Sequence, residues 1–84
     1  MNDRHDDFEK IYHQTFPALS KYLLFRVAQV SDMEDLLQNV YTDFYRKVLL
    51  PNKDIDDMTA YLTQMANNEL KRYYRWKKKA PLTL

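Results

Sequence analysis

The sequence predicts an all-α fold, a compact bundle of three helices of which the first is broken near Pro17. The 84 residues contain no Gly and only three Pro, so the chain lacks the turn chemistry that β-rich domains need. Apolar residues recur at intervals of three and four, which is the spacing of one helical face. The length suits a single domain with a modest core, and we expect residues 1–84 to form it, with residues 1–6 and 80–84 frayed.

The first helical pattern begins near Asp6 and runs to about Val30. Pro17 interrupts this pattern. Because proline removes one backbone donor and clashes with the preceding turn, we expect a kink or a short break at residues 14–16. The apolar stripe of the segment consists of Phe8, Ile11, Tyr12, Phe16, Leu19, Tyr22, Leu23, Phe25 and Val27.

The second helical pattern has the cleanest alternation of apolar and polar residues in the chain. Ser31 and Glu34 have the spacing of a capping box, in which each side chain bonds the backbone amide of the other residue, so we expect the helix to start there. Pro51 ends the helix, and residues 52–57 are expected to form a short polar loop. The apolar positions are Met33, Leu36, Leu37, Val40, Tyr41, Phe44, Val48 and Leu49.

The last helix is expected to follow that loop, with Asp56 or Asp57 as its cap. An acidic side chain at this position accepts hydrogen bonds from free backbone amides and suits the positive end of the helix. Cations near the other end also suit the helix dipole, and the tail after Pro81 is expected to fray. The buried stripe is expected to be Met58, Tyr61, Leu62, Met65, Ala66, Leu70 and Tyr73.

The stretch 66–79 combines cations with large aromatic residues. It holds six of the thirteen Lys and Arg but one of the twelve acids, a net charge of +5, whereas residues 1–65 carry seven basic and eleven acidic residues, a net charge of −4. A basic, aromatic helix end on an acidic body indicates a nucleic acid or another anionic partner. A solvated helix end, with Tyr73 or Tyr74 in the core, explains the same residues equally well. A membrane-surface helix is a weaker third interpretation, because the bundle needs the apolar face.

The polar side of the second helix is another candidate surface. Uncharged Gln38 and Asn39 lie beside Leu36 and Tyr41, which is a composition suited to protein docking. By physics alone, a plain solvated face is the more frequent explanation for such residues. The polar positions on this side are Glu34, Asp35, Gln38, Asn39 and Thr42.

The sequence argues against an enzyme. It has no Cys, no Gly-rich phosphate loop and no Ser/His/Asp constellation. His5 and His13, with Glu9 between them, fit a solvated helix start better than a metal site, and the acids at 54–57 lack the spacing of a calcium loop. We expect no cofactor and no metal. With no signal segment and no run near the ~18 apolar residues of a membrane span, we expect a soluble cytoplasmic protein.

Two segments resemble region 2 of bacterial sigma factors, most closely that of the small extracytoplasmic-function type. Residues 33–41, Met-Glu-Asp-Leu-Leu-Gln-Asn-Val-Tyr, resemble the acid-acid-Leu-apolar-Gln-polar-apolar-aromatic segment of that family. Residues 60–68, Ala-Tyr-Leu-Thr-Gln-Met-Ala-Asn-Asn, resemble its Ala-Trp-Leu-x-x-Ile-Ala-x-Asn segment, and a basic run follows, as the family leads one to expect. The resemblance covers nearly the whole chain in order, because the upstream residues Phe8 to Leu19 fit the first helix of the family.

The resemblance implies two binding surfaces. In the family, the middle helix docks on the clamp coiled coil of the RNA polymerase β′ subunit. The last helix and the loop before it contact the minus-ten promoter element and hold its melted single strand, where extruding a base costs about a few kcal/mol. The residues implied for polymerase binding are Asp35, Leu36, Gln38, Asn39 and Tyr41. Those implied for DNA binding are Asn52, Lys53, Asn68, Lys71, Arg72, Tyr74, Arg75, Trp76, Lys78 and Lys79.

Three departures from the family pattern matter. Tyr61 stands where Trp is usual, and Arg72 stands where the family often has Asp, which replaces an acid with a cation. Nothing in the chain matches the helix-turn-helix region 4 that reads the upstream promoter element. The chain is therefore expected to be either an excised domain of a longer sigma factor or a stand-alone region 2 of a split sigma factor. Its own Met1 and the lack of a following linker favour the split form.

We therefore expect a transcription-initiation module that docks on RNA polymerase and recognises and melts the minus-ten element. Its further partners are expected to be a region-4 protein or an anti-sigma factor, and no membrane. The alternative is a sigma-like protein-interaction co-regulator that binds polymerase or a sigma subunit without sequence-specific DNA recognition, and Arg72 keeps this alternative open. A plain basic DNA-binding bundle comes third.

Overall fold

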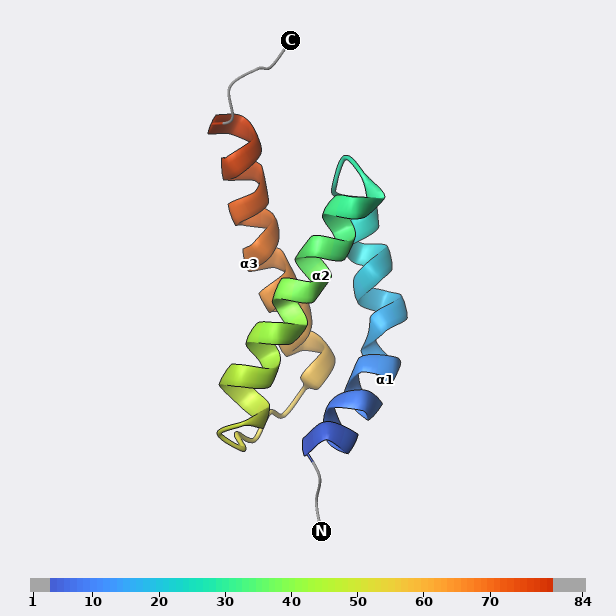
Figure 1. Ribbon diagram of the computed structural model, residues 1–84, viewed down its shortest axis with the longest axis vertical. Coiled ribbons are helices and arrows are strands. Elements are labelled where there is room, and N and C mark those ends of the chain that lie inside the picture. The colour runs from blue at the N-terminus through green and yellow to red at the C-terminus, as the bar shows by residue number, and fades with distance from the viewer. Residues whose placement is uncertain (1–3, 80–84) are drawn as a thin grey trace.

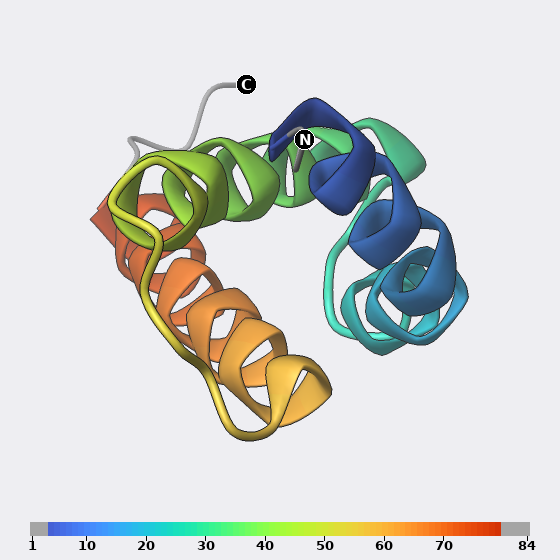
Figure 2. The same ribbon diagram turned by 90° about the horizontal axis from the view of Figure 1, so that it is seen from below.

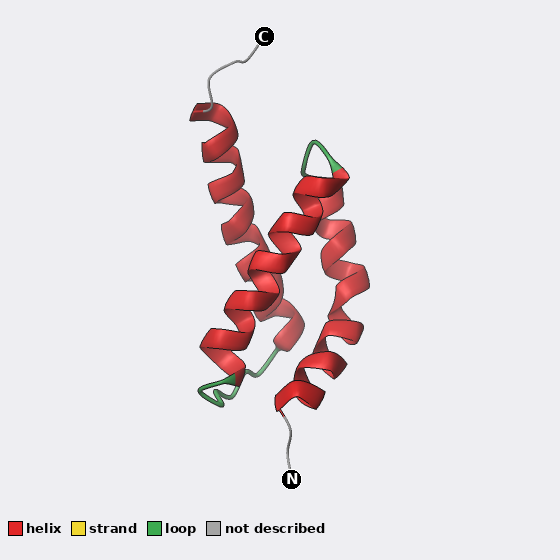
Figure 3. Ribbon diagram, in the orientation of Figure 1, coloured by secondary structure: helices red, strands yellow, loops and turns green. Residues whose placement is uncertain are grey.

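Every regular element in residues 4–79, the part of the chain that the structure describes, is helical (Figures 1 and 3). The structure is a computed structural model. Its elements are α1 (Arg4–Leu24), α2 (Val30–Phe44), a short π-helical segment η1 (Tyr45–Leu49) and α3 (Met58–Lys79). The predicted all-α bundle of three helices is confirmed. The sequence predicted fraying at residues 1–6 and 80–84. Residues 4–6 instead form the first turn of α1, so the prediction is wrong there, and residues 1–3 and 80–84 lie outside the described residues.

Helix α1 runs without a break through Pro17, so the predicted short break is wrong, while the alternative of a kink stays a prediction. Pro17 removes only one backbone donor, and the residues on both sides of it are held in the core, because Thr15, Leu19 and Leu23 are all buried. The Thr15 hydroxyl also donates to the Ile11 carbonyl at 2.7 Å, which supports the turn before the proline. Tertiary packing thus outweighs the local preference at this position.

Helix α1 ends at Leu24, well before the predicted end near Val30. The chain then turns through residues 25–29, and the Arg26 amide donates to the Leu23 carbonyl at 2.9 Å. The side chain of Phe25 is exposed in this turn. Phe25 fits the apolar spacing of the first helical pattern but is not buried, because α1 ends before this residue.

Helix α2 begins at Val30, and the predicted capping box at Ser31 is wrong. The N-cap residue is Gln29, which has an extended backbone and makes no side-chain cap bond. Its carbonyl accepts from the amides of Asp32 and Met33, so the helical hydrogen bonds start two residues earlier than expected. Ser31 is already helical, and its hydroxyl lies 3.3 Å from the Gln29 side-chain oxygen.

The helical backbone continues from α2 through η1 and ends where the sequence predicted, just before Pro51. The Leu50 amide donates to the Tyr45 carbonyl at 2.9 Å, the five-residue spacing of a π-helix. The predicted loop at 52–57 is confirmed, and Asn52 adopts a positive φ of 61° in it. Asp57 caps α3 as predicted, because its carboxylate accepts from the Ala60 amide at 3.1 Å.

Helix α2 packs against both α1 and α3, which flank it in the view along the bundle (Figure 2). The shared core is therefore centred on the apolar residues of α2. Two polar residues, Thr15 and Glu69, are also buried. The buried apolar residues are Leu19, Leu23, Leu36, Leu37, Val40, Tyr41, Phe44, Val48, Leu62, Ala66 and Leu70.

Candidate functional site

The polar face of α2 presents three of the five residues that the sequence implied for polymerase binding. Asp35, Gln38 and Asn39 are exposed. Leu36 and Tyr41 belong to the core instead, with 7% and 4% of their surface accessible. These two side chains pack the bundle, so the polar side of α2 offers only Asp35, Gln38 and Asn39 of the five to a partner.

Tyr41 is held in the core by a hydrogen bond. Its hydroxyl lies 2.7 Å from the hydroxyl of Thr15, and this bond joins α2 to α1. Burial raises the pKa of the Tyr41 phenol above its usual value of 10.0, while the Thr15 bond acts in the opposite direction. The buried Thr15 has two partners, since it also bonds the Ile11 carbonyl.

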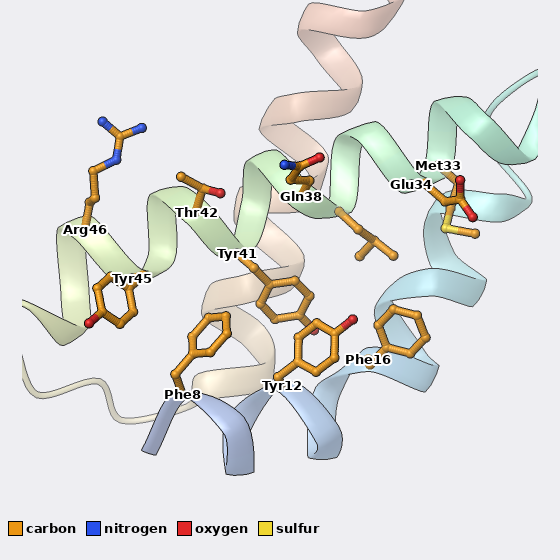
Figure 4. Close-up of a pocket in the computed structure, with 11 residues that line it drawn as sticks. Phe8, Tyr12, Phe16, Met33, Glu34, Gln38, Tyr41, Thr42, Tyr45 and Arg46 are labelled. Atoms are coloured by element: carbon orange, nitrogen blue, oxygen red, sulfur yellow. The ribbon is translucent and has the colours of Figure 1, made fainter. Parts of the chain in front are cut away.

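An aromatic groove of about 820 Å³ lies between α1 and α2, beside Gln38 (Figure 4). The Phe8 ring meets the rings of Tyr41 and Tyr45 edge to face, at centroid distances of 6.1 and 5.7 Å. The sequence did not predict this groove, because aromatic residues spaced four apart on one helix are also the usual pattern of a buried helix face. The groove is lined by Phe8, Tyr12, Phe16, Met33, Glu34, Leu37, Gln38, Tyr41, Thr42, Tyr45 and Arg46.

A second, basic groove of about 440 Å³ lies between α2 and α3 and gathers four of the residues implied for DNA binding. These four are Asn68, Lys71, Arg72 and Arg75. Asp43 of α2 and Lys47 of η1 also line the groove, and Val40, Tyr61 and Met65 supply apolar surface. Lys47 was missed by the sequence reasoning. Its only signal was a cation near the end of α2, and the packing of α2 on α3 could not be read from periodicity.

Glu69 lies in this basic groove and connects its two helices. One carboxylate oxygen accepts from the Asn39 amide of α2 at 3.2 Å, and the other accepts from the Arg72 guanidinium at 2.7 Å. The carboxylate side chain is 9% accessible, whereas Arg72 remains largely exposed. Glu69 therefore joins a residue of the polar α2 face to a residue of the groove.

Tyr74 and Trp76 lie outside the lining of the basic groove. The Tyr74 hydroxyl donates to the Arg26 carbonyl at 2.6 Å, although half of the residue is exposed. Trp76 is 63% exposed, and Lys77 Nζ lies 5.5 Å from the centroid of its ring system. Of the two, Trp76 has the freer aromatic face.

The remaining residues implied for DNA binding are not gathered with these. Asn52 and Lys53 are exposed in the loop after η1, at the end of the molecule opposite to the C-terminal half of α3 (Figure 1). Lys78 and Lys79 belong to the last turn of α3, but their side chains lie outside the described residues.

The described residues contain no group of three or more His, Cys, Asp or Glu side chains that could hold a metal ion. His13 Nε2 lies 3.9 Å from Glu9 on an exposed face of α1, and the side chain of His5 lies outside the described residues. None of the helices in residues 4–79 combines the length and the apolar character that crossing a membrane requires.

Comparison with known families identifies the domain to which most of the chain is similar. The family model for Sigma-70 region 2 matches residues 11–80, which are 70 of the 84 residues and include all of α2, η1 and α3. Both the polar face of α2 and the basic groove fall inside the matched range. No curated protein and no solved structure matches the chain.

Proposed function

The chain belongs to the Sigma-70 region 2 family, and from this membership we propose that it is a transcription-initiation module with one surface for RNA polymerase and another for promoter DNA. Sigma-70 region 2 is a non-enzymatic domain of sigma factors that binds polymerase and recognises the minus-ten element. The observation that carries the proposal is that α2 presents an exposed polar face and that a basic groove lies between α2 and α3.

The polymerase surface in this proposal is the polar face of α2, with the clamp coiled coil of the β′ subunit as its partner. Asp35, Gln38 and Asn39 offer a charge and two amides that can bond a helical partner. Leu36 and Tyr41 act indirectly, because their burial fixes the rotation of α2 and so decides which residues point outward.

The DNA surface is the basic groove. Lys71, Arg72 and Arg75 supply cations for phosphates, while Asn68 supplies a donor and an acceptor suited to a base edge. The exposed ring of Trp76 is a face on which an unpaired base can stack, a contact of about 1–3 kcal/mol. In this proposal Lys78 and Lys79 add positive charge near the end of α3, and the loop holding Asn52 and Lys53 captures an extruded base.

A region 2 module needs a separate segment to read the upstream promoter element. We propose that region 4 is supplied by a partner chain, as in a split sigma factor, or by the same polypeptide in a longer form, and that an anti-sigma factor can bind in its place. The short motifs at 33–41 and 60–68 support an assignment to the extracytoplasmic-function type, acting in the cytoplasm.

Polymerase docking is tested by mixing the protein with the isolated β′ clamp coiled coil and measuring the complex by size-exclusion chromatography and calorimetry. The double variant Asp35→Ala/Gln38→Ala should lose at least tenfold in affinity. The matched control is Gln14→Ala/Asp56→Ala, which removes the same side-chain types from exposed positions away from α2. Equal affinities for the two double variants, or no complex with the wild type, would sink this part of the proposal.

Promoter recognition is tested with single-stranded oligonucleotides that carry a minus-ten sequence or a scrambled version of it. Tighter binding of the minus-ten strand is expected. A second candidate function, the co-regulator without sequence-specific DNA recognition, is favoured by the observation that Arg72 is already paired with Glu69. Equal binding of the two strands, combined with normal clamp binding, would favour that candidate.

A further inference from the structure

The C-terminal half of α3 is tied to the start of α2 by the hydroxyl group of Tyr73. This oxygen accepts from the Ala28 amide at 3.0 Å and donates to the Asp32 carboxylate at 2.8 Å. The two partners come from the turn after α1 and from the first turn of α2. One side chain of α3 thus contacts two segments that lie 45 and 41 positions before it in the chain.

Further contacts surround this hydroxyl. Tyr74 donates to the Arg26 carbonyl at 2.6 Å, and Lys77 Nζ lies 3.9 Å from the same Asp32 oxygen that Tyr73 contacts. Arg26 is itself held, because its guanidinium donates to the Tyr22 carbonyl and lies 3.9 Å from the centroid of the Tyr22 ring. The turn at 25–29 is therefore a fixed support for α3.

Electrostatics favour this arrangement on both sides. Asp32 lies in the first turn of α2, where the helix dipole stabilises a negative charge. Burial raises the pKa of the Tyr73 phenol above its usual 10.0, and Asp32 acts in the same direction, so Tyr73 keeps the proton that it donates. The Tyr73 hydroxyl therefore remains a hydrogen-bond donor at neutral pH.

The end of α3 needs such a support. Six cations in the stretch 66–79 repel one another, and the last carbonyls of a helix have no partner within the helix. In Figure 1 the last turns of α3 extend beyond the turn that joins α1 to α2. Without a tertiary contact near Tyr73, the last turns of α3 would fray, and the cations of this helix end would no longer be held in one orientation.

We propose that Tyr73 and Asp32 are a positioning pair that holds the basic end of α3 in the orientation needed for single-stranded DNA. The inference rests on the proposed function, because it assigns these residues to the DNA surface of the same module. Neither residue needs to touch the nucleic acid. They act through Lys71 and Arg75, which lie within one turn of Tyr73 on α3 and line the basic groove.

The test compares Tyr73→Phe with Tyr45→Phe. Both variants remove one hydroxyl from a half-buried ring, but Tyr45 packs on Phe8 at the other end of α2. In Tyr73→Phe, amide hydrogen exchange in residues 71–79 should become about three- to tenfold faster. Affinity for the minus-ten strand should fall by a similar factor, because the variant loses the net free energy of one or two hydrogen bonds. Clamp binding should stay within about twofold of wild type, and Tyr45→Phe should change neither exchange in α3 nor DNA affinity.

Three results would overturn the proposal: unchanged exchange in residues 71–79, unchanged DNA affinity despite faster exchange, or parallel losses of DNA and clamp binding that report general unfolding. Failure of the proposed function looks different. In that case the wild type itself does not prefer the minus-ten strand, while Tyr73→Phe still accelerates exchange at the end of α3 and so supports the structural half of the inference.

Discussion

Glu69 is a buried acid that partly neutralises the positive charge of the basic groove. Its two carboxylate oxygens bond Asn39 and Arg72, and its side chain is largely buried. The pairing neutralises part of the Arg72 charge where a phosphate would otherwise be attracted. Arg72 is therefore restrained in direction and weakened as a free cation at the same time.

Replacing Glu69 by Gln should separate these two effects. The variant loses a charge-assisted bond to Arg72, and we expect the free energy of unfolding to fall by about 1 kcal/mol in urea denaturation. Single-stranded DNA should bind about two- to fivefold more tightly at low salt, because Arg72 is no longer neutralised. Glu34→Gln is the control, since it makes the same chemical change on an exposed residue outside the basic groove. Weaker DNA binding by Glu69→Gln would mean that the orientation of Arg72 matters more than its free charge.

Two tyrosines should make the fold sensitive to alkali. Burial is the largest cause that raises the pKa of Tyr41 and of Tyr73 above 10.0. An unfolded tyrosine ionises near pH 10, so the stabilising contribution is fully present below that pH and is lost as the pH rises through the higher folded pKa. The free energy of unfolding should therefore decline above about pH 10. Tyr41→Phe should have a shallower decline, and an unchanged slope would argue against a buried phenol at this position.

At the scale of the elements, the sequence predicts the helices better than their ends. Apolar spacing placed all three helices, since each has one face in the shared core. The ends depend on backbone hydrogen bonds that side-chain patterns describe poorly. Ser31 has the spacing of a capping box, yet the N-cap of α2 is Gln29, whose carbonyl accepts from the amides of Asp32 and Met33. Pro17 predicts a break in the first helix, yet α1 is continuous because residues on both sides of the proline are buried in the core.

The start of α3 offers a direct test of one such end. The sequence left Asp56 and Asp57 as alternative caps, and in the structure the Asp57 carboxylate accepts from the Ala60 amide. Asp57→Ala should lower the free energy of unfolding by about 1 kcal/mol in urea denaturation, because that amide loses its partner. The neighbouring variant Asp56→Ala removes the same charge and should change stability by less than about half of that amount. Equal losses would indicate a general charge effect rather than a cap.

At the scale of the whole molecule, the two surfaces could be located from the sequence only in part. The motif residues on α2 include two core side chains, Leu36 and Tyr41, because a helical motif records both the inner and the outer face. The basic groove also contains Lys47 from η1, which lies far from the basic stretch in the sequence. The bond from Tyr73 to Asp32 spans 41 positions, and no periodicity within one helix reports such a contact.

The uneven charge of the molecule leads to a prediction about salt. If the cations of the basic groove meet phosphates, the logarithm of DNA affinity should fall linearly with the logarithm of salt concentration, by about 0.7 per phosphate contact on a single strand. Lys71→Gln and Arg75→Gln should each reduce that slope by about 0.7, measured by fluorescence anisotropy across a salt series. Lys21→Gln removes an exposed cation from α1, outside the groove, and should lower affinity slightly without changing the slope. Equal slope changes for Lys21→Gln and Lys71→Gln would mean that DNA responds to net charge alone, and the basic groove would then have no special role in binding.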